Sequence, residues 1–409
     1  MTAATQRPRP KIGLVCSGGG ARGAWEAGIV RYVREELPPD VRRHVRFDIL
    51  AGTSVGAMTC CYLAATMDNP DEQGRGLASL WTSLSLEQVF KVAGESAWSV
   101  GRKMWKATRN NEHPDGWRLY DLLHPEPLEN MVNQRIAWPR IAANLAKGTF
   151  DAISVSTTRI RDGRTQVFVQ RREPGLPEWS RDPWTVATEV VLSPEHALAS
   201  AAIPLLFRSV KIGDEYYCDG FVRQNTPVAP ALRLGADRLL ILSLGHKPKA
   251  AVEPPKFTNL PTTPQVIGKV LNALMLDRLD HDLARLRRVN ALVERGRQLG
   301  GDAFVEQLNA TLSDTRGQPY RFVRELVVRP SRDLAELARP HLEARAKKET
   351  DDALPTRLLH RLAGSQLLSQ AELGSYLLFD APYARDLIQL GMDDAHARRE
   401  QLLEFFAPD

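Results

Sequence analysis

Two short apolar runs near the start of the chain each end in a glycine-containing turn, and a helical pattern follows directly in both cases. The first run, residues 11–16, leads into Ser17-Gly-Gly-Gly-Ala-Arg-Gly23, and the second, residues 47–51, leads into Gly52-Thr-Ser-Val-Gly56. Apolar runs of this length, bounded by glycine, are typical of buried strands. Strands that alternate with helices build layered α/β folds, so we predict a mostly parallel central sheet.

The rest of the chain divides into parts with different patterns. Further strands are expected at 150–156, 165–170, 215–218 and 238–244. The strand pattern lapses in a lid-like stretch, and after the proline-containing stretch 247–256 a helical pattern begins at about residue 264. The predicted organisation is a disordered lead-in over 1–10, a main domain over 11–250 with a lid-like insertion at about 86–140, and a mainly helical region over 251–409 that adds one strand, at about 320–329, to the same fold.

Composition places the chain among ordinary globular proteins, with 43% hydrophobic and 25% charged residues. No stretch approaches the roughly 18 uncharged apolar residues that a membrane span needs. The first ten residues hold no apolar segment of the secretory kind, and the four cysteines show no CxxC spacing, so we expect reduced thiols and a cytoplasmic location. The net charge of +5 is unevenly placed, and the mild positive bias of residues 1–250 suits a surface that meets anionic lipid but is too weak to indicate nucleic-acid binding.

The turn Gly52-Thr-Ser-Val-Gly56 carries the sharpest chemical signal. It has the GxSxG spacing of a nucleophile elbow, in which small residues let the strand and the helix come close and leave the serine hydroxyl exposed. Backbone N–H groups at the start of the following helix favour the negative charge that develops during acyl transfer. The alternative is a glycine turn in which Ser54 only caps the helix; the flanking strand and helix favour Ser54 as a nucleophile.

The first turn contains Gly18-Gly-Gly-Ala-Arg-Gly23, whose consecutive glycines can direct several backbone N–H groups at one oxyanion. The same residues also match GxGxxG, the pattern of a dinucleotide-binding turn. That alternative requires an acidic residue at the end of the next strand. Here the next strand ends in Ala51-Gly52, and its only acid, Asp48, stands at its beginning. We therefore favour oxyanion binding.

A third candidate, Asp219, ends the strand pattern in Tyr216-Tyr-Cys-Asp-Gly220. A carboxylate there could accept the proton of the serine directly, although an ordinary aspartate, with a pKa of about 3.9, is a weak base at neutral pH. The competing hypothesis is a histidine-based triad, because the order serine, aspartate, histidine is that of the α/β-hydrolases. His246 follows the next strand, and His196 lies near Ser200 in a helical stretch.

Together, the glycine turn, the GxSxG elbow and the later Asp-Gly pair resemble the patatin-like phospholipases. Two connecting stretches are similar as well, Ala199-Ser-Ala-Ala-Ile-Pro204 and the stretch 219–228. The similarity is specific over about residues 11–245 and fainter beyond, where Ser375-Tyr-Leu-Leu-Phe379 resembles the tail of some bacterial members. It implies a three-layer patatin-like α/β fold with a helical lid region and a mainly helical C-terminal extension.

The resemblance also implies the roles of the site residues. Ser54 would be the nucleophile and Asp219 the base of a dyad without histidine. The oxyanion hole would be formed by the first turn, from the backbone amides of Gly19, Gly20 and Ala21, with Arg22 ordering the loop. The family cleaves ester bonds of phospholipids and lysophospholipids, generally without a metal, and we expect no cofactor. Family members usually carry glycine or alanine after the Asp-Gly pair, where this chain has Phe221, and this departure leaves the substrate range open.

The stretch 91–109 contains five basic residues and one acid, and Trp98 and Trp105 are seven apart, so both would lie on one face of a helix. Basic residues with tryptophans are typical of a helix that lies on a membrane surface. The alternative is a lid whose tryptophans pack over the active site. We expect peripheral contact with the inner membrane face.

The sequence leaves three hypotheses about function. The first is a lipid acyl hydrolase, in which water resolves an acyl-enzyme at Ser54. The second is an acyltransferase that passes the acyl group to another lipid or alcohol through the same dyad. The third is an inactive module that binds a membrane or a partner; such a module has no need of Ser54, Asp219 and the glycine turn together, so we favour the hydrolase.

Overall fold

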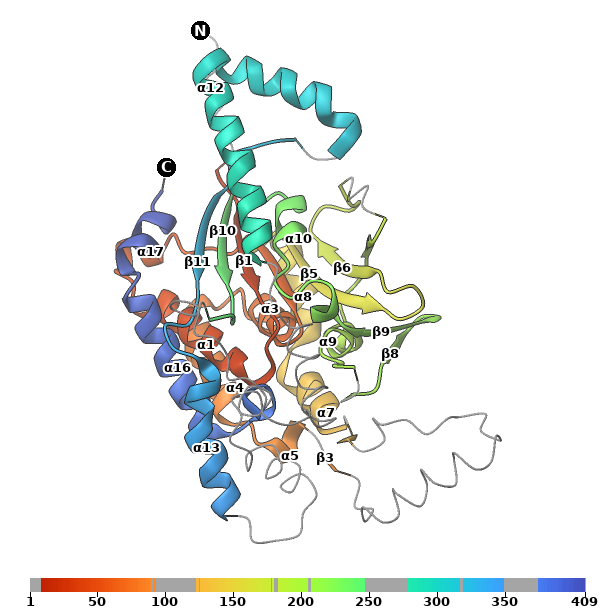
Figure 1. Ribbon diagram of the computed structural model, residues 1–409, viewed down its shortest axis with the longest axis vertical. Coiled ribbons are helices and arrows are strands. Elements are labelled where there is room, and N and C mark those ends of the chain that lie inside the picture. The colour runs from red at the N-terminus through yellow and green to blue at the C-terminus, as the bar shows by residue number, and fades with distance from the viewer. Residues whose placement is uncertain are drawn as a thin grey trace, which may run out of the picture.

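A twisted sheet with helices on both faces forms the centre of the molecule (Figure 1). The computed structural model describes residues 9–89, 91–92, 123–124, 126–177, 179, 183–204, 207–246, 279–316, 319–348 and 374–408. Within these residues the sheet has nine strands: β1 (Ile12–Cys16), β2 (Ile49–Thr53), β5 (Ala152–Arg159), β6 (Thr165–Arg171), β7 (Thr185–Glu189), β8 (Val210–Ile212), β9 (Glu215–Asp219), β10 (Arg238–Leu242) and β11 (Arg324–Val328).

The strand order is β11-β10-β1-β2-β5-β6-β7, with β9 paired to β5 and β8 paired to β9. The pairs from β11 through to β5 are parallel, as is β6 with β7, whereas β5 with β6, β5 with β9 and β8 with β9 are antiparallel. The predicted α/β fold with a mostly parallel sheet is therefore confirmed. The strands β7 and β8 were not expected, because β7 is half-buried or exposed along its length and β8 has only three residues, so neither forms an apolar run.

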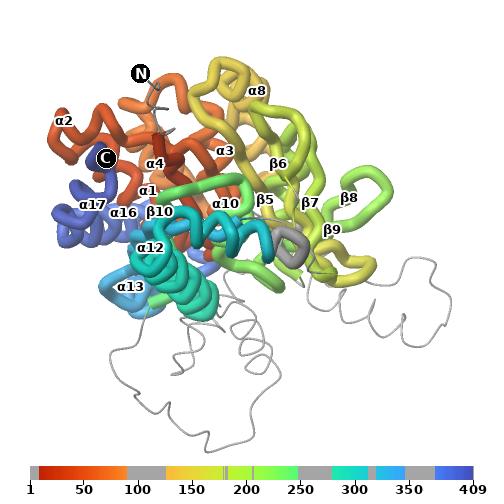
Figure 2. Tube along the Cα trace, turned by 90° about the horizontal axis from the view of Figure 1, so that it is seen from above, coloured from red at the N-terminus to blue at the C-terminus, as the bar shows by residue number. Residues whose placement is uncertain are grey.

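Two hydrophobic layers enclose the sheet, and the side chains on each face of the sheet belong to one of them. Figure 2 shows α1 (Ala24–Glu35), α3 (Val55–Ala65) and α16 (Ala381–His396) on one side of the sheet and α10 (Val228–Arg233) and α12 (Leu279–Arg316) on the other. Small and apolar residues make up almost the whole of α3, so this helix is buried against the sheet around most of its circumference. The helix α12 is interrupted at Gly300 and Gly301, which have non-helical backbone angles.

Late segments of the chain pack directly on early ones. β11 pairs with β10 at one edge of the sheet, and α16 lies along α1, as the adjacent red and blue elements in Figure 1 show. Glycines allow this close approach, since a Cβ atom added at Gly28 would lie 2.1 Å from the Ile388 carbonyl oxygen, and one added at Gly391 would lie 2.2 Å from that of Trp25. The C-terminal helices α13 (Leu334–Lys348), α16 and α17 (Arg399–Phe406) thus belong to the main core.

The lid-like stretch is described only at its two ends. It follows α4 (Pro70–Thr82), begins with α5 (Leu86–Val89) and ends with α7 (Glu126–Arg135) and the start of α8 (Trp138–Ala146). Between them, β3 (Lys91–Val92) pairs antiparallel with β4 (Leu123–His124). Trp98 and Trp105 lie outside the described residues, so their membrane contact stays a prediction. Among the helices that the structure describes, none is both long and apolar enough to cross a membrane.

The contact between α1 and α16 yields a test of how far the C-terminal helices stabilise the fold. Gly391→Leu places a side chain where the Trp25 backbone lies, so the two helices must separate. We expect the free energy of unfolding, measured by urea titration, to fall by about 2 kcal/mol or more, as overpacking of a core does. Gly245→Leu is the control, because Gly245 is exposed and its nearest neighbour would lie 3.6 Å from the added Cβ. An equal loss in both variants would contradict this view of the helix contact.

Candidate active site

The site forms where two strands of opposite direction end beside a third. β6 pairs with one edge of β5 along residues 152–158, so β2 and β9 share the other edge. Thr53, the last residue of β2, pairs with Ser156, and Asp219, the last residue of β9, pairs with the next residue, Thr157. The two strand ends therefore meet head to head, and this register brings Ser54 and Asp219 together across 165 residues of sequence.

Ser54 occupies a sharp turn between β2 and α3. Its φ of 55° and ψ of −128° make it the one non-glycine residue with positive φ in the described part of the chain. This backbone region costs of order 1–3 kcal/mol and persists only where the surroundings enforce it. Gly52 and Gly56 make the turn possible, because a Cβ on either would lie within 2.4 Å of a backbone carbonyl oxygen, that of Gly56 or of Cys16.

Asp219 is fully buried and accepts hydrogen bonds at both carboxylate oxygens. Ser54 Oγ donates to Oδ2 at 2.6 Å, and the Phe221 backbone N–H donates to Oδ1 at 3.0 Å. Burial raises the pKa of Asp219 from its usual value to about 7, and the bonds from Ser54 and Phe221 oppose this rise. A carboxylate with a pKa near 7 is a far better proton acceptor at neutral pH than an ordinary aspartate.

The glycine turn after β1 lies against the same serine. A Cβ atom added at Gly18 would lie 3.1 Å from the Ser54 Cβ, and Gly18 donates its backbone N–H to the Asn225 carbonyl oxygen at 3.1 Å. Gly20 and Ala21 begin a 3₁₀ helix, η1 (Gly20–Gly23), and the first N–H groups of a helix have no partner within it. Gly20 has a φ of 55° and lines the cavity that contains Ser54.

Arg22 fastens this turn to a segment near the end of the chain. Its Nε donates to Ser375 Oγ at 2.8 Å, and its guanidinium lies 3.8 Å from the centre of the Tyr376 ring. Gly20 must be glycine here, since an added Cβ would lie 2.2 Å from the Tyr376 carbonyl oxygen. The buried arginine therefore holds the turn through residues that are 353 positions away in the sequence.

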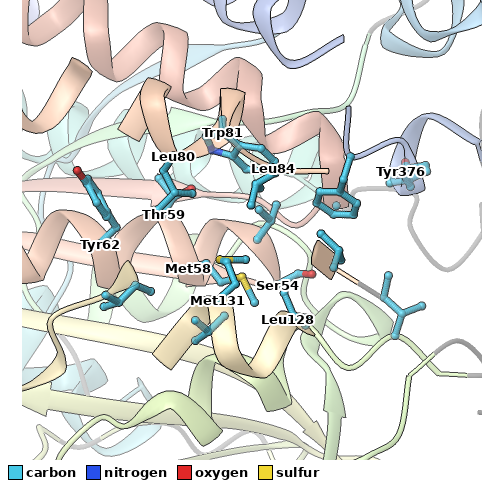
Figure 3. Close-up of a pocket in the computed structure, with 18 of the residues that line it drawn as sticks. Ser54, Met58, Thr59, Tyr62, Leu80, Trp81, Leu84, Leu128, Met131 and Tyr376 are labelled. Carbon is cyan, nitrogen blue, oxygen red and sulfur yellow. The ribbon is translucent and has the colours of Figure 1, made fainter. Parts of the chain in front are cut away.

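A largely apolar cavity extends from Ser54 between three helices (Figure 3). α3 lines it with one face, α4 and α7 form further walls, and the C-terminal segment contributes Tyr376, Leu377 and Phe379. Other residues that line it are almost all apolar: Val55, Met58, Leu77, Leu80, Trp81, Leu84, Val89, Leu128, Met131, Val132, Ile136, Ala201, Ile203 and Phe207. A lining of this kind suits an apolar ligand.

The two candidate histidines lie elsewhere. His246 Nδ1 is 3.1 Å from the Pro330 carbonyl oxygen, and His196 Nδ1 accepts from the Ser193 backbone N–H while its ring lies edge-on to Phe168. In the described part of the chain, no histidine hydrogen-bonds to Ser54 or Asp219. Phe221 is buried in the core and does not line the cavity, so its ring does not narrow the site.

Ser200, at the end of α9 (Pro194–Ser200), contacts the site in a way that spacing alone did not predict. Its Oγ accepts the Ser54 backbone N–H at 2.8 Å and donates to the Ser156 carbonyl oxygen at 2.6 Å. The hydroxyl thus ties the strained turn to β5. The sequence held one signal for this residue: the stretch Ala199-Ser-Ala-Ala-Ile-Pro204 belongs to the family resemblance described above. That resemblance gave its serine no role.

Fold and site together define a class: an α/β protein with a serine–carboxylate pair at a strand-to-helix turn and a glycine turn beside it. The family model described as Patatin-like phospholipase matches residues 14–232, more than half of the 409 residues. The chain belongs to this family. The resemblance stated from the motifs is therefore confirmed.

Three relatives match shorter segments. A patatin-like phospholipase domain-containing protein of Caenorhabditis elegans, ZK370.4, is 40% identical over 79 residues, which are 18% of this chain and 5% of that protein. Lysophospholipase NTE1 of Kluyveromyces lactis is 28% identical over 144 residues, 33% of this chain and 10% of its own. Patatin-like protein 2 of Arabidopsis thaliana is 30% identical over 146 residues, 34% of this chain and 33% of its own. The matches thus cover a third or less of each relative.

A solved structure, VipD from Legionella pneumophila, aligns with 97% of this chain and 67% of its own at 12% identity. Its TM-score of 0.35 is too low for any argument about function.

The bond from Ser54 to Ser200 leads to a test of the turn. Ser200→Ala leaves the buried Ser54 N–H without its acceptor, a loss of about 1–3 kcal/mol. We expect kcat toward a carboxylic ester to fall at least about tenfold while KM changes little, because the cavity is untouched. Ser156→Ala is the matched control: its hydroxyl has no hydrogen-bond partner among the described residues, and the bond from Ser200 uses its backbone carbonyl. Equal kcat losses in both variants would show that Ser200 acts only through packing.

Proposed function

We propose that the protein is a serine lipid acyl hydrolase that cleaves carboxylic ester bonds of phospholipids or lysophospholipids. The observation that supports this most directly is the 2.6 Å hydrogen bond from Ser54 Oγ to the buried Asp219, where Ser54 lines an apolar cavity. Family membership points the same way, and one relative carries the name lysophospholipase.

In the first half of the reaction, Asp219 accepts the hydroxyl proton of Ser54 as Oγ attacks the ester carbonyl carbon. The negative charge that develops on the carbonyl oxygen is stabilised by the backbone N–H groups of Gly19, Gly20 and Ala21. The carbon–oxygen bond to the alcohol then breaks, and the leaving oxygen takes the proton from Asp219. The products of this half are the free alcohol portion of the lipid and an acyl group bound to Ser54.

In the second half, Asp219 accepts a proton from a water molecule as that water attacks the acyl carbon. The bond to Ser54 Oγ breaks, Oγ recovers the proton, and the fatty acid leaves. The base is suited to both steps because burial places its pKa at about 7, so it can take and return a proton near neutral pH.

The apolar cavity supports a fatty acyl chain as the part of the substrate that is recognised. Contact with a membrane surface, from which such a lipid would be drawn, is a proposal that rests on the sequence of residues 91–109. The peripheral location at the inner membrane face has the same basis.

The proposal is tested by hydrolysis of p-nitrophenyl esters and of phospholipid vesicles, together with labelling by a fluorophosphonate probe. We expect Ser54→Ala to abolish both labelling and turnover, and Asp219→Asn to lower turnover by at least about a thousandfold, because the serine then has no base. His246→Ala should retain the activity of the parent protein, since that histidine contacts Pro330. Activity that survives Ser54→Ala, or is lost in His246→Ala, would overturn the dyad.

The pKa of Asp219 also predicts a pH profile. The base must be ionised, so kcat/KM should rise roughly tenfold per pH unit well below pH 7 and level off above it. Because an ordinary histidine titrates in the same range, the profile is recorded in His246→Ala as well, where it should be unchanged. A plateau that extends down to pH 5 would contradict a base with this pKa.

The pH dependence of the free energy of unfolding gives an independent measure of the protonation of Asp219. The folded-state pKa of about 7 is above that of the unfolded chain, about 3.9, so the contribution of Asp219 to stability is fully present below pH 3.9 and is lost as pH rises through 7. This loss should be absent from Asp219→Asn, measured by denaturant unfolding at several pH values. If both proteins lose the same stability over this range, Asp219 is not the group responsible.

A further inference from the structure

The cavity beside Ser54 has a defined far end. Ser54 precedes α3, and α3 places Met58, Thr59 and Tyr62 along the cavity in that order. Figure 3 shows Tyr62 at the opposite end from Tyr376, with Ser54 between them. Tyr62 is the last residue of α3 that lines the cavity. An acyl chain that leaves Ser54 along α3 therefore meets the Tyr62 side chain.

The helix fixes the distance available. Ser54 and Tyr62 are eight positions apart, and at 1.5 Å per residue this amounts to about 12 Å along the helix axis. Side chains on a helix lean toward its N-terminus, which shortens the space that Tyr62 leaves free. The accessible length is thus no more than that of an extended decanoyl chain.

The side chain of Tyr62 lies against the neighbouring helix, α4. Its hydroxyl oxygen lies only 2.2 Å from where a Cβ atom of residue 76 would be, and Tyr62 Cζ would lie 3.5 Å from it. Gly76, on α4, therefore provides the space into which the hydroxyl fits. The side chain is half-buried, lines the cavity and lies against α4 at Gly76, so its ring stands at this end of the cavity.

The other residues along this path give a chain nothing polar to bind. Met58, Leu80 and Met131 line the middle of the cavity, and Thr59 directs its hydroxyl at Glu26 Oε2, 3.4 Å away. Methionine side chains adapt to the shape of an apolar ligand, so the width of the cavity is adjustable. Its length is not, because an aromatic ring ends it.

We propose that Tyr62 is a specificity-determining residue that sets the upper limit on acyl chain length, so that the preferred substrates carry straight, medium-length acyl groups. This inference rests on the proposed function, because it takes the acyl chain to extend from Ser54. It adds to that function the class of acyl group accepted and the residue that limits it.

The test is a chain-length profile of kcat/KM with butyryl, octanoyl, dodecanoyl and palmitoyl p-nitrophenyl esters. The parent protein should favour octanoyl over palmitoyl. Tyr62→Ala should raise the ratio of kcat/KM for palmitoyl to that for octanoyl at least about tenfold, because a pocket lengthened by several methylenes discriminates between chains by this much. Tyr62→Phe is the matched control: it keeps the ring that closes the cavity, so its profile should be that of the parent.

A second measurement does not depend on turnover. Binding of saturated fatty acids to Ser54→Ala, by isothermal titration calorimetry, should strengthen with chain length up to about decanoate and then level off. In Ser54→Ala combined with Tyr62→Ala, the affinity should continue to rise to palmitate.

The outcomes separate this inference from the proposed function. If the parent cleaves esters and Tyr62→Ala ranks the four chains as the parent does in both assays, Tyr62 does not set the limit and the inference is overturned while the hydrolase assignment stands. If no ester is cleaved but removal of Tyr62 extends the fatty-acid profile, the hydrolase fails and the assignment of Tyr62 stands.

Discussion

The hydrogen bond between Ser54 Oγ and Asp219 Oδ2 depends on a register in the sheet, and the rest of the site depends on that bond. β2 and β9 approach each other along one edge of β5 and end at adjacent residues of it. This arrangement holds two unfavourable features in place: the positive φ of Ser54 and the burial of the Asp219 carboxylate with no countercharge among the described residues. The sheet, the glycines of the turn and the hydroxyl of Ser200 together maintain them.

These two features serve the proposed chemistry. The strained turn directs the Ser54 hydroxyl at Asp219, and burial raises the pKa of Asp219 toward neutral pH, where the proposed mechanism needs its base to act. Both reduce stability, which is a common consequence of building an active site. The surrounding core is correspondingly extensive, with the whole of β2 buried and α3 packed against it. Glu26 adds a second buried carboxyl behind the glycine turn, and its burial raises its pKa as well.

The C-terminal part of the chain completes the site although the family match ends at residue 232. Ser375 and Tyr376 contact Arg22 in the glycine turn, and Leu377 and Phe379 form part of the cavity wall. The Phe379 ring stacks on Trp81 of α4, 6.3 Å away. The apolar cavity is thus enclosed by segments from both ends of the chain, which the contact of α1 with α16 brings together.

Sequence alone determined the local features: strands ending in glycine turns, the GxSxG elbow, the glycine turn and the Asp-Gly pair. These depend on short-range backbone geometry, in which only glycine permits certain angles or close contacts, so they can be read from adjacent residues. Tertiary structure decided what lies near Ser54. The register that brings Asp219 to it, the hydroxyl of Ser200 from α9 and the closure of the cavity by Tyr62 all depend on packing between distant segments, and no spacing within one segment encodes such contacts. The raised pKa of Asp219 has the same origin, because burial is a property of the folded chain rather than of the residue.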